Sequence, residues 1–293
     1  MNQLFLLIFF SALSLVSLSQ KPGADWPVFR GTYNLTGYAA SALPAAPALL
    51  WSVSTGEGSK SSPVISDGII YFGNLKGNVY AVSPEGKIIW KKETGGTAES
   101  PPMIYGDYLF IGGGDGIMRA FDKKTGRLLW SYSTDNQIVG SANIWSAGKS
   151  TGLIFGSYDY YLHCVDPLTG RLLWKLETEN YVNGTPAVMN NRIVFGGCDG
   201  MVRIADPLTG RERNRFETGG YIAASPAISG ERAWFGDYDG NLYCLDMISG
   251  KMVWEVPAGK GSGAIMAIPA AGRNMLVVGN EDKYLYCYNS GSG

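Results

Sequence analysis

The sequence predicts an all-β protein: a single closed β-propeller of six four-stranded antiparallel blades, in which an N-terminal strand completes the last blade. Three observations lead to this prediction. A segment of about forty residues recurs along the chain, each copy carries signals for four short strands, and a strand with no repeat in front of it precedes the first copy. Repeats of this length without helices are typical of propeller blades.

The recurring segment is clearest in CVDPLTGRLLW, residues 164–174, where a strand end, a turn and a strand closing on tryptophan follow one another. A glycine after the second strand marks each unit at intervals of 39 to 44 residues, as Gly73, Gly112, Gly156, Gly196, Gly236 and Gly279. In the first unit we expect strands A to D at residues 62–66, 69–72, 78–82 and 87–91.

Tight turns are expected between strands B and C, where Asp-Gly pairs recur, as at Asp115-Gly116 and Asp199-Gly200. Asp-Gly favours the type I′ hairpin turn, which needs positive φ at both central residues. Two units depart from this pattern, with Asp159-Tyr160 and Asp282-Lys283.

The two ends of the repeat region predict that the ring closes. Residues 263–289 supply strands A to C of the last unit, and residues 49–53 form a D strand without a unit before it. Pairing between them would remove the exposed sheet edges that otherwise invite aggregation. This closure argues against an open solenoid, which is the competing architecture.

An apolar N-terminal segment predicts export. Residues 4–18 form a run shorter than the roughly 20 residues of a membrane-spanning helix, and Ser17 and Ser19 suit signal-peptidase cleavage. We expect a signal peptide at 1–19, an extended arm at 20–48 that Trp26 and Phe29 anchor, and the propeller at 49–293. The mature protein is then periplasmic or secreted, with no membrane span. Because the first basic residue is Lys21, after the apolar run, an uncleaved anchor remains an alternative.

Charge and cysteine content narrow the class further. The chain has 24 basic and 25 acidic side chains and a net charge of −1, so it lacks the basic excess of nucleic-acid-binding modules. Cys164, Cys244 and Cys287 occupy the repeat position that Ala81, Ala120 and Ala205 hold elsewhere. Equivalent positions in different blades should lie beyond the roughly 7 Å between Cα atoms that a disulfide can bridge. We therefore expect small buried thiols.

The segment GDYDGNLYCLDMISGKMVW, residues 236–254, resembles the tryptophan-docking repeat of quinoprotein-like (PQQ-like) propellers. The segment DWPVFRG, residues 25–31, is similar to the N-terminal segment common in these proteins, and the resemblance extends to the C-terminus. It implies that each tryptophan packs between the small residue of strand C and the neighbouring blade. The tryptophans concerned are Trp51, Trp90, Trp130, Trp174 and Trp254.

The fourth unit departs from this pattern, because Asn214 stands where tryptophan belongs. Two interpretations of its polar outer strand, which runs through Arg211 and Arg213, stay open. The strand is either a solvated variant of the repeat or an edge that contacts a partner.

The same resemblance raises the question of quinone chemistry. The PQQ-dependent dehydrogenases of the family use an adjacent cysteine pair, a Ca²⁺ cluster and a catalytic aspartate, and no residue here matches that set. We therefore expect no catalytic residue, no metal ion and no cofactor, neither PQQ nor calcium. The single histidine, His163, is expected on the strand face opposite the docking residue, as a surface or interblade side chain. The turn aspartates are expected to stabilise their own turns.

Function is then expected on the face where the B–C and D–A loops open. Aromatic rings beside acids and amides suit a peptide or a sugar. The candidate residues are Glu99, Tyr158, Tyr160, Tyr181, Asn183, Tyr221, Asp237, Tyr238 and Lys283.

The resulting hypothesis is a monomeric, non-catalytic propeller that binds protein partners of the cell envelope as a scaffold. It resembles the outer-membrane assembly propeller lipoproteins, but it has six expected blades instead of eight. It also has no cysteine before Cys164 to carry a lipid. A carbohydrate- or envelope-polymer-binding propeller is the first alternative, and a PQQ-dependent or other propeller enzyme is the second.

Overall fold

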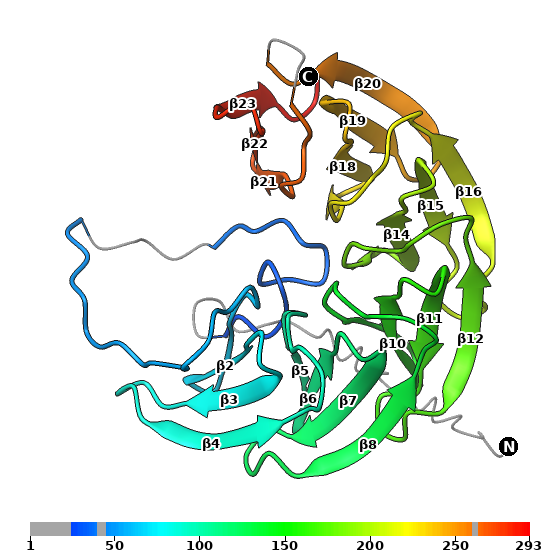
Figure 1. The fold of residues 1–293 in the computed structure, drawn as a ribbon. Helices are drawn as coiled ribbons and strands as arrows, with labels where there is room; N and C mark the ends of the chain where they lie inside the picture. Colours follow the sequence, from blue (N-terminus) through cyan, green and yellow to red (C-terminus); the bar gives the residue numbers. More distant parts are fainter. Residues whose placement is uncertain (1–24, 40–44, 260–262) are drawn as a thin grey trace, which may run out of the picture.

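The computed structural model describes residues 25–39, 45–259 and 263–293. These residues form six antiparallel sheets, which follow one another around a common centre (Figure 1). The predicted all-β propeller with six blades is confirmed. Among the described residues no helix is long and apolar enough to cross a membrane. The predicted signal peptide, residues 1–19, lies outside the described part of the chain.

Each blade is a meander of adjacent strands. The first blade consists of β1 (Val64–Ser66), β2 (Ile69–Gly73), β3 (Asn78–Val82) and β4 (Ile88–Glu93). The second consists of β5 (Met103–Tyr105), β6 (Tyr108–Gly112), β7 (Ile117–Asp122) and β8 (Leu128–Ser133). The third consists of β9 (Asn143–Ala147), β10 (Ser150–Gly156), β11 (Tyr161–Val165) and β12 (Leu172–Glu177).

The other three blades follow the same order. The fourth consists of β13 (Ala187–Met189), β14 (Arg192–Gly196), β15 (Met201–Ala205) and β16 (Glu212–Glu217). The fifth consists of β17 (Ala227–Ser229), β18 (Arg232–Gly236), β19 (Asn241–Asp246) and β20 (Lys251–Pro257). The sixth has three strands, β21 (Ala270–Gly272), β22 (Met275–Gly279) and β23 (Leu285–Asn289).

The hydrophobic pattern of each strand matches its place in the blade. Strands B, such as YLFIG in β6 and RIVFG in β14, are almost wholly buried, as strands covered on both faces should be. Outer strands such as LLWKLE in β12 alternate between exposed and half-buried residues, because one of their faces meets solvent. The sequence therefore separates inner from outer strands.

The B–C turns differ from the type I′ turn that the Asp-Gly pairs predict. Only the glycine position is left-handed, with φ of 74° at Gly116 and 74° at Gly200, whereas the aspartate before it has negative φ. The Gly116 N–H also donates to the Gly113 carbonyl oxygen (3.1 Å). This is the longer hairpin loop in which an ordinary turn is followed by one left-handed residue.

Tryptophan from one blade lies on a glycine of the next. A Cβ on Gly126, Gly170 or Gly210 would lie 2.4 to 2.8 Å from the indole of the preceding blade, so only glycine fits beneath the ring. The indole Nε1 donates to a nearby carbonyl oxygen of the same turn. These bonds join Trp51 to Pro84 (2.7 Å), Trp90 to Lys123 (2.9 Å), Trp130 to Pro167 (3.0 Å) and Trp174 to Pro207 (2.9 Å).

On its own sheet each tryptophan lies opposite a small residue of strand C. The cross-strand pairs are Ala81 with Trp90, Ala120 with Trp130, Cys164 with Trp174 and Cys244 with Trp254. In the fourth blade Asn214 pairs with Ile204. The prediction that Ala205 occupies the small-residue position is therefore wrong, because Ala205 follows that position by one residue. A larger isoleucine thus stands where the tryptophan is missing, and Asn214 lies on Gly250.

The hydrophobic core lies between the blades. The buried residues form five clusters, and each joins two consecutive blades from the first to the sixth. Among the described residues no such cluster joins the sixth blade to the first. Burial of apolar area contributes about 25 cal/mol per Å², so these interblade contacts are the main stabilising term.

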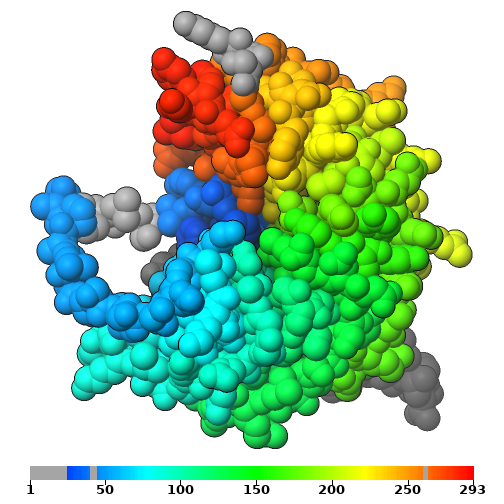
Figure 2. Space-filling model, viewed as in Figure 1, coloured from blue at the N-terminus to red at the C-terminus, as the bar shows by residue number. Residues whose placement is uncertain are grey.

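The N-terminal arm lies along the innermost strands. Its backbone carbonyl oxygens accept hydrogen bonds from strand A of five blades, and in the third blade the Asn143 side chain donates to the Tyr33 carbonyl oxygen (2.7 Å). The five backbone bonds are Ile65 to Trp26 (2.9 Å), Ile104 to Pro27 (2.7 Å), Val188 to Tyr33 (2.8 Å), Ile228 to Asn34 (2.8 Å) and Ala271 to Thr36 (3.0 Å). The arm, blue in Figure 2, therefore lies against the first and last blades at the centre of the molecule.

The predicted closure of the ring is wrong in this structure. Residues 49–53 form no strand, Leu49 and Leu50 are 86% and 87% exposed, and β23 pairs only with β22. Figure 1 shows the resulting gap between β23 and the first blade. Trp51 still makes the contact with Pro84 and Gly86 that the other docking tryptophans make with the following blade, so closure fails at the missing pairing of residues 49–53 with β23.

The open edge also changes one of the cysteine predictions. Cys164 and Cys244 are buried thiols, as expected, and no cysteine of the described residues forms a disulfide. Cys287 is exposed, because no D strand covers its side of β23.

Trp90→Ala is expected to lower the free energy of unfolding by about 3–5 kcal/mol, since it leaves a cavity over Gly126 and removes the bond to Lys123. Guanidinium unfolding followed by fluorescence and circular dichroism measures the loss. Trp51→Ala is the matched control, and its cost should be less than half, because its segment pairs with no strand. Equal losses would contradict the role given to interblade packing.

Asn214→Trp and Ile204→Ala are expected to be coupled. Alone, the first overpacks the site at a cost of about 1–3 kcal/mol, and the second leaves a cavity that costs about 2–5 kcal/mol. Together they recreate the arrangement of Cys164 with Trp174, so the double variant should be at least about 1 kcal/mol more stable than the sum predicts. A double-mutant cycle on unfolding free energies tests this, and strict additivity would show that Ile204 does not fill the tryptophan site.

Candidate binding surface

The B–C turns and the D–A loops lie side by side on one face of the propeller. In every blade a backbone N–H of the B–C turn donates to a carbonyl oxygen of the D–A loop that leads into that blade. The bonds are Leu75 to Gly58, Gly114 to Thr97, Tyr158 to Gln137, Cys198 to Tyr181, Tyr238 to Tyr221 and Glu281 to Ala264, at 2.9 to 3.3 Å. This repeated bond brings the variable residues of both loop sets to the same surface.

Tyrosines gather on this face over the third to fifth blades. We call Tyr158, Tyr160, Tyr181, Tyr221 and Tyr238 the tyrosine face. The rings of Tyr158 and Tyr181 stack with centroids 4.4 Å apart, and the Tyr160 ring lies 5.4 Å from Tyr181. The Tyr158 hydroxyl donates to Oδ1 of Asn183 (3.0 Å), so the predicted residues Tyr158, Tyr181 and Asn183 form one cluster.

The second part of the tyrosine face is more exposed. Tyr221 and Tyr238 meet edge to face at 6.3 Å and are 58% and 43% exposed. Burial raises the pKa of Tyr158, and the neighbouring acidic groups of Cys198, Tyr238, Tyr181 and Glu99 raise it further. The two tyrosine pairs lie on the loops of neighbouring blades on the same face of the propeller.

Tyr160 occupies a backbone position that four other blades give to glycine. Its φ is 75°, as at Gly116 and Gly200, although left-handed backbone is unfavourable for a bulky side chain. The side chain is nevertheless 43% exposed, so contacts within the chain only partly offset this strain. Strained residues of this kind concentrate at functional sites.

The other predicted residues contribute less to this surface. Glu99 forms an ion pair with Lys60 (3.5 Å), and Lys283, also left-handed at φ 75°, belongs to the last blade. Asp237 needs a correction, because its side chain is fully buried and cannot meet a ligand. Its carboxylate accepts hydrogen bonds from the Tyr243 hydroxyl (2.7 Å) and the Asn241 N–H (2.8 Å).

A column of strand C side chains holds the turn carboxylates in place. Arg119 pairs with Asp115, Arg203 with Asp199 (2.7 Å) and His163 with Asp159 (3.0 Å), each four residues apart. Tyr286 donates to Asp282 in the same way (2.5 Å). Sequence reasoning assigns these aspartates to their turns alone, although the spacing of four residues recurs in the sequence and could have revealed the pairs.

His163 is an interblade residue, one of the two expected places for it. It is buried, its Nδ1 lies 3.1 Å from the Tyr132 hydroxyl of the second blade, and its ring stacks on Phe155. Burial opposes ionisation of Asp159, but the hydrogen bond and charge of His163 outweigh it and hold the pKa of Asp159 below its usual value. The pair therefore links two blades and has no substrate-accessible proton.

The polar outer strand of the fourth blade binds internal partners. Arg203 is almost fully buried and reaches both Asp199 and Glu212 (3.2 Å). Arg213 pairs with Asp206 of the preceding turn. These pairs favour the interpretation of β16 as a solvated variant of the repeat.

The thiols are poor nucleophiles. Burial raises the pKa of Cys164 to about 12 and that of Cys244 to about 11. The pKa of Cys198 is raised by burial and by Asp199. A reactive cysteine needs a stabilised thiolate, which none of these environments provides.

The residues present do not fit a quinone–calcium centre. In the described part of the chain no three His, Cys, Asp or Glu side chains lie together as metal ligands. The turn carboxylates are paired with strand C, and the inner edges of the A strands are bonded to the arm. We therefore derive no catalytic step through such a cofactor.

Comparison with known proteins agrees with the repeat architecture. A family profile described as outer membrane protein assembly factor BamB matches residues 39–152 and 140–293. A segment of 73 residues is 37% identical to the outer membrane protein assembly factor BamB of Burkholderia pseudomallei (strain K96243), covering 25% of this chain and 19% of that protein. A segment of 76 residues is 34% identical to the quinoprotein alcohol dehydrogenase PedE of Pseudomonas putida, covering 24% and 11%. The chain thus matches less than a fifth of the length of these relatives.

Solved structures share the fold at low sequence identity. BamB from Moraxella catarrhalis superposes with a TM-score of 0.72 and 19% identity, over 83% of this chain and 77% of that one. A europium-containing methanol dehydrogenase superposes with a TM-score of 0.69 and 14% identity, over 81% and 58%. A BamB protein and a methanol dehydrogenase are thus both similar in fold, which shows that fold alone does not decide function. The family profile, in contrast, spans the repeats of all six blades, and this chain belongs to the PQQ-like repeat β-propeller family described as outer membrane protein assembly factor BamB.

Proposed function

We propose that this chain is a non-catalytic, exported propeller that binds a protein partner of the cell envelope through its tyrosine face. The observation that carries the proposal is the gathering of five tyrosines on the loops of three neighbouring blades, where the repeats differ from one another. Tyrosine offers a large apolar ring and a polar hydroxyl with few rotatable bonds, and it is enriched in protein interfaces.

We propose no reaction, because the carboxylate and imidazole side chains that could act as acids or bases form contacts within the protein. The carboxylates of Asp115, Asp159 and Asp199 are paired with strand C, and His163 bridges two blades. General acid–base catalysis needs such groups to reach a substrate. The exposed polar groups of the tyrosine face are mainly phenols, which suit recognition.

An envelope partner is supported by family membership and by the predicted export signal. The family profile, which covers most of this chain, and one of the two relatives are named as outer membrane protein assembly factor BamB. We therefore place the partner among envelope proteins in this proposal. A scaffold needs a rigid surface, and the tyrosine loops are carried by blades with fully buried cores.

The paired variant Tyr221→Ser/Tyr238→Ser tests this proposal. Aromatic residues at the centre of an interface often contribute about 2 kcal/mol or more each, so partner binding should weaken at least about tenfold. The immobilised propeller is incubated with a cross-linked envelope extract, and the protein that it retains is identified. The affinity of the purified partner for the propeller is then measured. Tyr284→Ser is the matched control, because Tyr284 is 64% exposed but belongs to the last blade.

Unchanged affinity in the tyrosine variant would refute the proposed surface. A carbohydrate ligand is the second candidate, favoured by the stacked Tyr158 and Tyr181 rings beside the Asn183 amide. Binding of purified envelope polysaccharide that is lost in Tyr158→Ser/Tyr181→Ser, with no protein retained, would establish this candidate instead. Sustained dye-linked alcohol oxidation after addition of PQQ and Ca²⁺ would overturn the non-catalytic assignment.

A further inference from the structure

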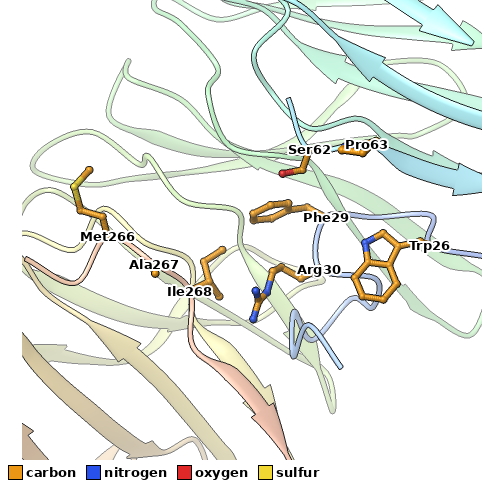
Figure 3. Close-up of a pocket in the computed structure, with 8 residues that line it drawn as sticks. All are labelled: Trp26, Phe29, Arg30, Ser62, Pro63, Met266, Ala267 and Ile268. Atoms are coloured by element: carbon orange, nitrogen blue, oxygen red, sulfur yellow. The ribbon is translucent and has the colours of Figure 1, made fainter. Parts of the chain in front are cut away.

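A cavity of about 530 Å³ opens where the last blade faces the first. Trp26, Phe29 and Arg30 of the arm line one side of it (Figure 3). Ser62 and Pro63 come from the loop before β1, and Met266, Ala267 and Ile268 from the loop before β21. The cavity therefore joins three segments that lie far apart in the sequence.

A chain of hydrogen bonds around the axis links the first five blades and ends before this cavity. From the first to the fifth blade, residues just before strand A link each D–A loop to the next. The bonds are Ser61 Oγ to Ser100 O (3.1 Å), Ser100 Oγ to Gly140 O (2.8 Å), Ser141 N to Thr185 Oγ1 (2.9 Å) and Thr185 N to Ser225 Oγ (2.7 Å). In the last blade Ile268 holds the place of Ser225 and has no hydroxyl, so this side of the cavity is apolar.

Arg30 brings an uncompensated positive charge to this cavity. Its Nη2 donates to the carbonyl oxygens of Pro269 (3.0 Å) and Thr36 (3.4 Å), but no carboxylate of the described residues forms an ion pair with it. Its Nε is buried without a partner. Burial also lowers the pKa of Arg30. By comparison, the buried Arg203 has both Asp199 and Glu212 as partners.

Arg30, whose side chain lines the cavity, has a strained backbone conformation. The Gly31 N–H donates to the Val28 carbonyl oxygen (2.8 Å), which closes a turn whose third residue, Arg30, has φ of 64°. Glycine is the usual residue at that position of such a turn. Glycine is instead needed at the fourth position of the turn, because a Cβ added at Gly31 would lie 2.6 Å from the Trp26 ring. An arginine held at this cost, beside a cavity, indicates a use for its charge.

We infer that this cavity binds a carboxylate on an apolar body, with the carboxylate at Arg30 and the body against Phe29, Met266 and Ile268. A guanidinium forms charge-assisted N–H···O bonds with a carboxylate, and Nη1 of Arg30 makes no hydrogen bond to the described residues. Aromatic and aliphatic side chains line the remaining space. Such a ligand is either a free organic acid or the C-terminus of a polypeptide ending in an apolar residue.

Isothermal titration calorimetry with two matched probe pairs tests this inference. The first pair is 3-phenylpropanoate and its uncharged amide, and the second is Gly-Gly-Phe with a free or an amidated C-terminus. Each acid should bind at least about tenfold more tightly than its amide, with an affinity that falls as salt is added. The pair that binds more tightly identifies the source of the carboxylate.

Met266→Glu and Met266→Gln separate the charge from the fold. Met266 is 50% exposed, so both variants should fold, but only Met266→Glu adds a competing negative charge to the lining of the cavity. Met266→Glu should weaken acid binding at least about tenfold, whereas Met266→Gln stays within about threefold of the original protein. Tyr221→Ser/Tyr238→Ser should bind the probes normally, so failure here is distinct from failure of the tyrosine face.

Three outcomes would overturn the inference: equal affinity for acid and amide, no binding of either acid at millimolar concentration, or equal affinity of the two Met266 variants. Arg30→Gln serves as a secondary test. This change should abolish acid binding, but it also removes the bond to Pro269. Circular dichroism and melting temperature are therefore compared before its affinity is interpreted.

Discussion

The contact between an indole and a glycine of the next blade is the constraint on which the rest of the structure depends. Glycine is required for two reasons at the end of the C–D turn: the backbone there is left-handed, and the residue lies directly beneath a tryptophan ring. The glycines concerned are Gly126, Gly170 and Gly210. The second and third blades therefore carry both halves of the contact, a tryptophan for the following blade and a glycine for the preceding one, whereas the fourth carries only the glycine. This explains why the motif recurs so faithfully without any catalytic role. The fourth blade supports the same view, since the loss of its tryptophan is accompanied by a larger residue, Ile204, on the facing strand.

The arm solves a different problem from the tryptophans. The innermost strand of a blade presents unpaired N–H groups toward the axis, and buried backbone donors need partners. The arm supplies them for strand A of all but the third blade directly, and through Asn143 it also reaches the third. Val28 and Leu35 insert into two of the interblade cores at the same time. An incomplete ring can thus keep its inner edge satisfied, although the outer edge of β23 stays open.

The parts of the fold that could be predicted are those that repeat. Strand order, inner and outer strands and the docking positions of Trp90, Trp130 and Trp174 follow from local patterns that recur several times. Closure could not be predicted, because Trp51 docks on the first blade as the repeat implies, and only the three-dimensional distance between β23 and residues 49–53 decides whether the two segments pair. The assignment of Ala205 is wrong by one residue, because Ile204 stands two residues before the turn aspartate, where Cys164 stands in the third blade, and it is Ile204 that pairs with Asn214. For the site, the loops that carry the tyrosines were predictable, but the inward direction of Asp237 was not, since it is set by Tyr243.

Two positions of the chain carry backbone strain, and a third lacks a hydroxyl that the other blades provide. Tyr160 replaces a left-handed glycine, Arg30 takes a turn position that favours glycine, and Ile268 replaces a hydroxyl that would continue the chain of loop bonds. Left-handed backbone at a residue other than glycine costs on the order of 1 kcal/mol or more, and a buried guanidinium without a carboxylate costs further free energy. Contacts within the chain offset these costs only in part, because Tyr160 contacts Tyr181 but is 43% exposed, and Arg30 lacks an ionic partner among the described residues. We therefore propose that interactions from outside the chain supply the remainder, so that these positions, and not the repeated motif, mark the surfaces where binding partners belong.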